Sequence, residues 1–205
     1  MSTTKLTSPL VISVLVIAGA GCDDRVATPI PASPPSEPVP EATAPADDRS
    51  VARHETGRTP WNAEFKSAPH VGVRGEAELE EVAGGVLVEV RLEGAPAGEK
   101  GLHIHQTADC SDIPNKSMGG HFAPENRDHG LPTAEEHHTG DLGNITIGED
   151  GKGRLRFTVR GANLQKGDPM SLIGRSVVLH ESNDKGTGKA GDAGRPVACA
   201  PIEAS

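Results

Sequence analysis

The chain has 205 residues, a net charge of −9 and an aromatic content of only 2%. It contains no long basic run, which argues against nucleic-acid binding. A core so poor in aromatic side chains must rely on Val, Leu and Ile, helped by cross-links or bound metal.

Residues 1–22 are typical of a signal peptide. Lys5 precedes an apolar run from Leu10 to Ala18, which is too short to span a bilayer. Small residues then lead to Cys22, and this ending resembles a bacterial lipobox in which Gly19 replaces the usual leucine. We therefore predict that Cys22 carries a lipid. The alternative is an ordinary secretory signal followed by a chance cysteine.

Residues 23–58 are expected to form a disordered tether. Seven prolines lie between Pro29 and Pro45, and large apolar side chains are almost absent. Such a segment cannot bury enough surface to fold, and its prolines make it extended and semi-rigid. Together with a lipid on Cys22, it predicts an exported, membrane-anchored lipoprotein of the periplasm or cell surface.

The remaining residues, 59–205, suffice for one domain with one core. Short alternating runs dominate this part, and the clearest is 86–92, where Val and Leu alternate with charged residues after the turn signal Gly84-Gly85. Eight short strands with Gly-rich turns predict an all-β sandwich or barrel. Two long segments, about 106–141 and 181–196, are expected to be functional loops. The expected strands are 63–66, 73–79, 86–92, 102–105, 142–147, 154–159, 176–180 and 197–199.

The chain has three cysteines, an odd number for an exported protein. The count is explained if Cys22 carries lipid and Cys110 pairs with Cys199 in an oxidising compartment. Two unrelated free thiols are the alternative.

Histidines are concentrated in the second half of the chain. His103 and His105 lie two apart, so a strand would place both rings on one face. His180 ends an apolar run and, taken alone, would be a histidine at the edge of the core.

A second set of histidines lies in the first long loop. His121, His129, His138 and Asp141 offer three nitrogens and one oxygen, a shell that suits zinc. His137 is an alternative to His138, although His138 stands three residues before Asp141. A solvated surface segment is the simpler interpretation of this loop.

Four segments in chain order resemble motifs of the copper/zinc superoxide dismutase family, of the bacterial exported type. The second has one residue fewer between its glycine and its histidine than the family has. The four segments are Gly101-Leu102-His103-Ile104-His105, Gly120-His121-Phe122-Ala123-Pro124, His138-Thr139-Gly140-Asp141-Leu142-Gly143-Asn144 and Ile173-Gly174-Arg175-Ser176-Val177-Val178-Leu179-His180-Glu181.

The resemblance implies an eight-stranded Greek-key β-barrel or sandwich, immunoglobulin-like in its layers, with copper and zinc as cofactors. It implies copper bound by His103, His105, His121 and His180, and zinc bound by His121, His129, His138 and Asp141. It also implies that Asp184 orients one ligand of each metal and that Cys110 and Cys199 form the disulfide.

The implied activity is superoxide disproportionation to dioxygen and hydrogen peroxide, by redox cycling of copper with a zinc-anchored, bridging His121 that also carries a proton. The family places a substrate-guiding arginine three residues before the second disulfide cysteine. Here that residue is Pro196, so Arg195 is the expected guiding cation, with Lys185 and Lys189 as residues that could compensate.

Two other functions stay open at this point. The same fold could bind copper and zinc without efficient turnover, or the chain could be a structural surface lipoprotein with incidental histidines. A homodimer is compatible with the sequence, although the strands that could form its interface carry no distinctive pattern.

Overall fold

The computed structural model describes residues 60–203, which lie within the second of two compact units, Arg53–Ser205. The predicted signal peptide, the lipid site at Cys22 and the tether lie outside the described residues. Among the described residues, no helix has the length and apolarity needed to cross a membrane.

The described part of the chain forms nine β-strands in one antiparallel sheet. Their spatial order is β1-β3-β4-β7-β6-β5-β8-β9-β2. Because β4 lies beside β7 and β5 lies beside β8, the connections are of the Greek-key type. The strands are β1 (Trp61–Glu64), β2 (Lys66–Ser67), β3 (Arg74–Val82), β4 (Gly85–Glu93), β5 (Gly98–His105), β6 (Asp141–Ile147), β7 (Gly153–Arg160), β8 (Ser176–His180) and β9 (Pro196–Pro201).

The first segment closes the sheet into a nearly complete barrel. β1 pairs with β3, whereas β2, after the single residue Phe65, pairs with β9 at the other end of the sheet. The Phe65 amide donates to the Gly75 carbonyl at 2.9 Å. We expected one strand over residues 63–66, and this split explains why the structure has nine strands instead of eight. The all-β Greek-key prediction is confirmed.

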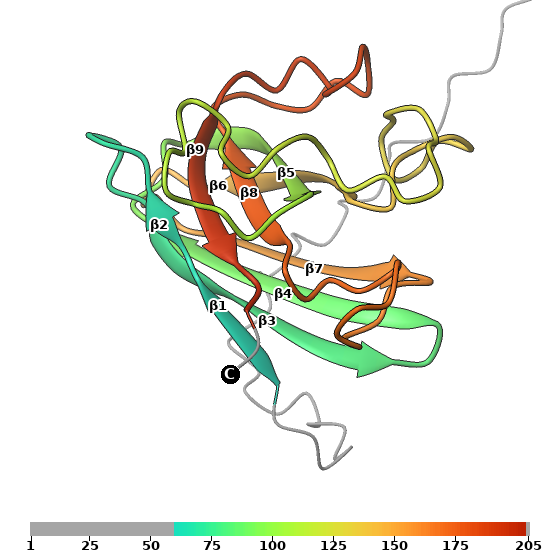
Figure 1. Ribbon diagram of the computed structural model, residues 1–205. Coiled ribbons are helices and arrows are strands. Elements are labelled where there is room, and N and C mark those ends of the chain that lie inside the picture. Colours follow the sequence, from blue (N-terminus) through green and yellow to red (C-terminus); the bar gives the residue numbers. More distant parts are fainter. Residues whose placement is uncertain (1–59, 204–205) are drawn as a thin grey trace, which may run out of the picture. The chain divides into compact units, whose positions relative to one another are not determined.

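The core fills the space between the two layers of the barrel that Figure 1 shows. The inward-facing residues of β4 are Val86, Val88, Val90 and Leu92, and each is at most 2% exposed. Burying an aliphatic side chain of this size stabilises the fold by about 1.5–3 kcal/mol. The alternation predicted for residues 86–92 is therefore present in the structure.

A smaller apolar cluster surrounds the disulfide between Cys110 and Cys199, whose Cα atoms lie 5.7 Å apart. Fully buried Met118 and Val178 of β8 belong to this cluster. The disulfide thus fastens the loop after β5 to strand β9, and Val178 of β8 belongs to the apolar cluster around it. This pairing is the one that the cysteine count and the family resemblance predicted.

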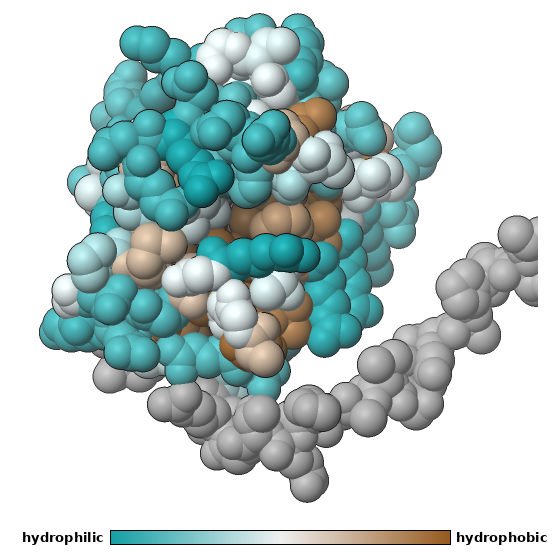
Figure 2. Space-filling model, turned by 90° about the vertical axis from the view of Figure 1, so that its right-hand side faces the viewer, coloured by the Kyte–Doolittle hydropathy of each residue, from teal (hydrophilic) through white to brown (hydrophobic). Residues whose placement is uncertain are grey.

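Most of the face drawn in Figure 2 is hydrophilic, with apolar side chains gathered near its centre. The two long loops lie outside the sheet, close to β5, β6, β8 and β9 (Figure 1). They comprise residues 106–140, between β5 and β6, and residues 181–195, between β8 and β9.

Candidate metal centre

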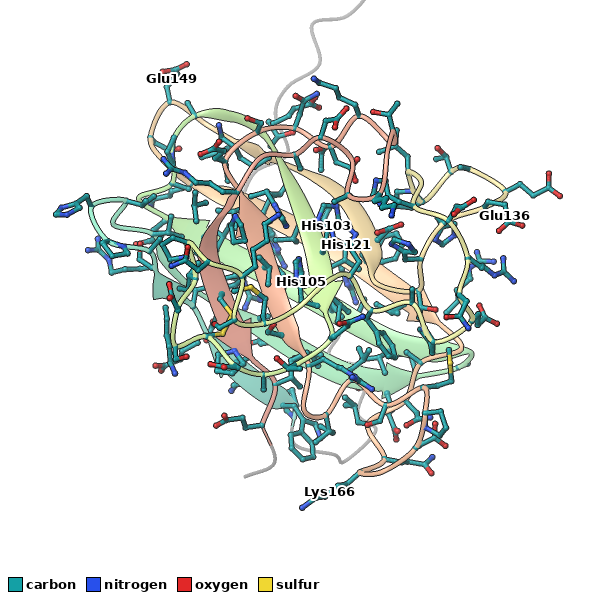
Figure 3. The ribbon with its side chains drawn as sticks, turned by 45° about the horizontal axis from the view of Figure 1, so that its top comes forward. His103, His105, His121, Glu136, Glu149 and Lys166 are labelled. Carbon is teal, nitrogen blue, oxygen red and sulfur yellow. A yellow bond between two sulfur atoms is a disulfide. The ribbon has the colours of Figure 1, made fainter. Side chains whose placement is uncertain are left out.

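Strand β5 presents two kinds of side chain to its two faces. Leu102 and Ile104 belong to the hydrophobic core and are fully buried. His103 and His105 point the other way and are also buried, at 0% and 2% exposure. The loops must therefore cover them, and Figure 3 shows both histidines gathered with His121 beside β5.

These two histidines form a four-imidazole group with His121 and His180. One ring nitrogen from each lies within 4.8 Å of the corresponding nitrogens of the other three. His180 ends β8, which pairs with β5, and His121 bridges to His105 through the backbone. The structure therefore brings together all four residues for which the family motifs imply copper binding.

Two of these imidazoles have a defined tautomer. His105 Nδ1 donates to the Gly119 carbonyl at 2.8 Å, and His180 Nδ1 donates to the Gly194 carbonyl at 3.2 Å. Each Nε2 therefore carries a lone pair, and the two Nε2 atoms lie 3.3 Å apart. Two facing lone pairs in a buried site create a position that suits a cation.

The second group joins three imidazoles to one carboxylate. The Nδ1 atoms of His121, His129 and His138 lie 2.9, 3.0 and 3.3 Å from Asp141 Oδ1. His137 instead donates from Nδ1 to the His138 carbonyl at 2.8 Å. Between the two neighbouring histidines, the structure therefore places His138 in the group.

Asp184 connects the two groups. Its Oδ2 accepts from His103 Nε2 at 2.8 Å and its Oδ1 accepts from His129 Nε2 at 3.0 Å. This carboxylate fixes the tautomer of one imidazole in each group, as acidic residues behind metal-binding histidines do. Gly191 passes so close that a side chain there would collide with Asp184 and His129.

Asn144 positions Asp184, a role that the sequence did not reveal. Its side-chain amide donates to the Asp184 carbonyl at 2.9 Å, and its Oδ1 accepts from the Asp184 amide at 2.6 Å. Asn144 is the last residue of the motif that begins at His138, and this is the only feature of the sequence that points to it. Only the fold shows that β6 reaches the loop before β9.

Within residues 60–203, three buried ring nitrogens make no hydrogen bond: His103 Nδ1, His121 Nε2 and His129 Nδ1. His129 Nδ1 lies 3.0 Å from Asp141 Oδ1, but it has no proton to donate, because the proton of this ring is on Nε2, which donates to Asp184. Leaving such a group unpaired costs about 1–3 kcal/mol. All three belong to the two groups, and those of His103 and His121 belong to the four-imidazole group. The missing hydrogen bonds and the types of donor fit a metal in each group. The four imidazoles suit copper, and the three imidazoles with one carboxylate suit zinc.

Comparison with known proteins agrees with this donor set. Residues 73–202 match the sequence model of the family described as copper/zinc superoxide dismutase (SODC). The chain belongs to the copper/zinc superoxide dismutase family. Membership makes it an oxidoreductase with copper and zinc as cofactors.

Individual relatives cover most of the domain. Superoxide dismutase (Cu-Zn) from Deinococcus radiodurans is 37% identical over 162 residues, which are 73% of this chain and 80% of the relative. Superoxide dismutase (Cu-Zn) A from Xenopus laevis is 41% identical over 126 residues, or 58% of this chain and 81% of the relative.

Solved structures show the same fold. The clock protein EA4 superposes with a TM-score of 0.61 at 35% identity, covering 71% of this chain and 96% of that one. A SOD-like protein from Bacillus subtilis superposes with a TM-score of 0.62 at 26% identity, covering 69% of this chain and 97% of that one.

Arg195, the expected guiding cation, forms an ion pair at the surface. Its Nε donates to Glu181 Oε2 at 2.8 Å, and 70% of its side chain is exposed. The structure therefore places the guanidinium beside a carboxylate, and its role in guiding substrate stays a prediction.

Burial keeps several of the histidines neutral. It lowers the pKa of His105 to about 2, that of His121 to about 4 and that of His180 to about 3. Neighbouring imidazoles lower all three values further, because a second positive charge nearby is unfavourable. Neutral imidazoles are the form that binds metal.

We expect the metal-free protein to lose stability as the pH falls below about 6.5. The unfolded chain binds protons at these histidines first, because their folded pKa values are lower. The free energy of unfolding should therefore fall by up to about 1.4 kcal/mol per pH unit for each histidine until its folded pKa is reached. Urea denaturation of the metal-free protein between pH 7.5 and 4.5 measures this slope, and a flat profile would contradict the three buried, neutral imidazoles.

Proposed function

We propose that this protein disproportionates superoxide to dioxygen and hydrogen peroxide at a two-metal site that shares His121. The observation that carries the proposal is the position of this ring. Its Nδ1 lies 2.9 Å from Asp141 Oδ1 in the second group. The residue also belongs to the four-imidazole group, and its other nitrogen, Nε2, is buried and makes no hydrogen bond.

In this proposal His103, His105, His121 and His180 hold copper, and His121, His129, His138 and Asp141 hold zinc. When bound, copper would supply the one-electron redox change that oxidises one superoxide and reduces a second, and zinc, which has no redox chemistry, would keep the shared ring in place.

The protein's own contribution is to position these ligands and to handle a proton. His121 is the group that can hold a proton at Nε2 beside the copper ligands, because its other nitrogen stays within the second group. Reduction to hydrogen peroxide consumes two protons, and His121 is placed to deliver one of them. Asp184 keeps His103 and His129 from rotating, since each donates to one of its oxygens.

Export and membrane attachment form part of the same proposal. The signal sequence at residues 1–22, lipid on Cys22 and a tether at 23–58 would hold the domain at a membrane, in the periplasm or at the cell surface. The disulfide supports an oxidising compartment. A relative from Brugia pahangi, named extracellular superoxide dismutase (Cu-Zn), is 35% identical over 143 residues. The intact mass of the mature protein tests the lipid, and sedimentation tests whether the chain forms a homodimer.

The deciding experiment is a superoxide consumption assay on protein reconstituted with copper and zinc, with both metals counted. We expect one copper and one zinc per chain, and equal amounts of dioxygen and hydrogen peroxide. Full metal content without turnover would instead support a metal-binding module of the same fold. The observation that favours this alternative is the ion pair of Arg195 with Glu181, because it engages the expected guiding cation.

A further inference from the structure

One arginine contacts the neighbours of two histidines in the four-imidazole group. Arg175 belongs to the motif that ends at Glu181, yet neither the donor set nor the proposed chemistry uses it. It lies directly before β8 and is half-buried. The Arg175 carbonyl accepts from the Ile202 amide at 2.8 Å, and its Nε donates to the Ser171 carbonyl at 3.4 Å. Backbone and side chain are therefore both held in place.

The guanidinium of Arg175 joins two segments of the long loop. Its Nη1 donates to the carbonyl of Gln106, the residue after His105. Its central carbon lies 4.5 Å from the ring centroid of Phe122, the residue after His121. The planar guanidinium suits this double role, because its edge can donate to a carbonyl while its face lies on an aromatic ring. One side chain thus links the residue that follows each of two imidazoles.

The two segments pair through their backbones. The Gln106 amide donates to the Gly120 carbonyl at 2.9 Å, and the Phe122 amide donates to the Ile104 carbonyl at 2.8 Å. The bridge between the two histidines lies between these bonds, and Figure 3 shows both histidines beside β5. Arg175 contacts both sides of this pairing, so it helps to fix how far apart the two imidazoles are held.

We propose that Arg175 is a positioning residue for copper binding, which sets the geometry of His105 and His121 through Gln106 and Phe122. The inference rests on the proposed function in that copper is the metal concerned, but it requires no reaction with superoxide. Ligands that are held in place before the metal arrives lose less conformational freedom when they bind it. Loss of the guanidinium should therefore weaken copper binding and change the copper environment while the chain stays folded.

The test compares Arg175→Gln with Arg175→Lys and with the control Arg160→Gln. Lysine keeps the charge, but as a point charge it cannot donate to Gln106 and also cover the face of Phe122. Arg160 is exposed and ends β7, which β6 separates from β5 in the sheet. Its substitution changes the net charge equally without touching the paired segments.

Two properties are measured for each variant. In the metal-free protein, hydrogen exchange is followed at the Gln106 and Phe122 amides, with the Phe65 amide, which donates to the Gly75 carbonyl, as the reference. In the copper-loaded protein, the dissociation constant of copper and the electron paramagnetic resonance spectrum of Cu(II) are recorded. The first property reports on the paired segments alone, and the second reports on the ligands.

We expect Arg175→Gln to speed exchange at Gln106 and Phe122 about tenfold relative to Phe65, because a hydrogen bond to a charged group is lost locally. Copper binding should weaken about three- to tenfold, less than the 10- to 100-fold typical of groups that touch a ligand directly. The hyperfine splitting of Cu(II) should change. Arg175→Lys should show most of these effects, and Arg160→Gln should match the wild type.

Unchanged exchange at both amides in Arg175→Gln would overturn the assignment, and so would equal acceleration at Phe65, which would indicate a general loss of stability. Full recovery in Arg175→Lys would also overturn it, because charge alone would then suffice. If Arg175→Gln does not fold, Phe122→Leu removes the aromatic face and keeps the arginine, and the Gln106 amide must then exchange faster for the assignment to stand. A wild-type protein that binds copper without consuming superoxide would sink the proposed function, while exchange and the copper spectrum still decide the role of Arg175.

Discussion

Replacing His180 with alanine is expected to remove copper and abolish superoxide consumption while zinc stays bound. His180 belongs to the four-imidazole group and not to the group around Asp141. Removing residues that merely orient a ligand costs about 10- to 100-fold in metal affinity or activity, so loss of a ligand should cost at least that much. Metal analysis after dialysis, together with the superoxide assay, measures both effects.

The matched control is His70→Asn. His70 is an exposed histidine on a turn with φ of 67°, a conformation that asparagine tolerates. This variant should keep both metals and full activity. Should His180→Ala retain copper in proportion to its chain concentration, the ligand assignment for this residue would be wrong. Loss of zinc together with copper would instead show that the two groups do not form independently.

The sequence predicts those parts of the fold that depend on local alternation. Val86, Val88 and Val90 face the core because side chains alternate along a strand, and the same rule places His103 and His105 on one face. The division of the first strand at Phe65 could not be predicted. It depends on the Gly75 carbonyl accepting from Phe65 and on β9 lying at the opposite edge of the sheet.

Ligand types and motif order single out histidines and an aspartate that the structure brings together, and their metal-binding roles stay predictions. The sequence is less informative about exposed charged side chains, each of which has several possible partners. Nothing in the local sequence indicates that Arg195 would lie against Glu181, because both side chains are long and exposed.

Removing the disulfide is the substitution expected to destabilise the protein most. Cys110 and Cys199 are 89 residues apart in sequence, and closing a loop of this size should stabilise the fold by about 4–5 kcal/mol in the chain-entropy model. A Cys110→Ser/Cys199→Ser double variant avoids leaving a reactive thiol. Its free energy of unfolding, measured with denaturant on metal-free protein, should be lower by about this amount.

The effect should extend from stability to the site, because the disulfide holds the loop that carries Gly119 and His121. Without it, the Gly119 carbonyl no longer has a fixed position, and His105 loses the acceptor that sets its tautomer. Copper affinity should therefore fall in the double variant, and bound metals should restore part of its stability, since they bind only the folded chain. Reduction of the wild-type disulfide should reproduce the variant's denaturation curve, whereas a reductant should leave the variant unchanged. If the two metal-free proteins unfolded within about 1 kcal/mol of each other, the loop would be held by the packing of Met118 and its neighbours, and the covalent bond would be redundant.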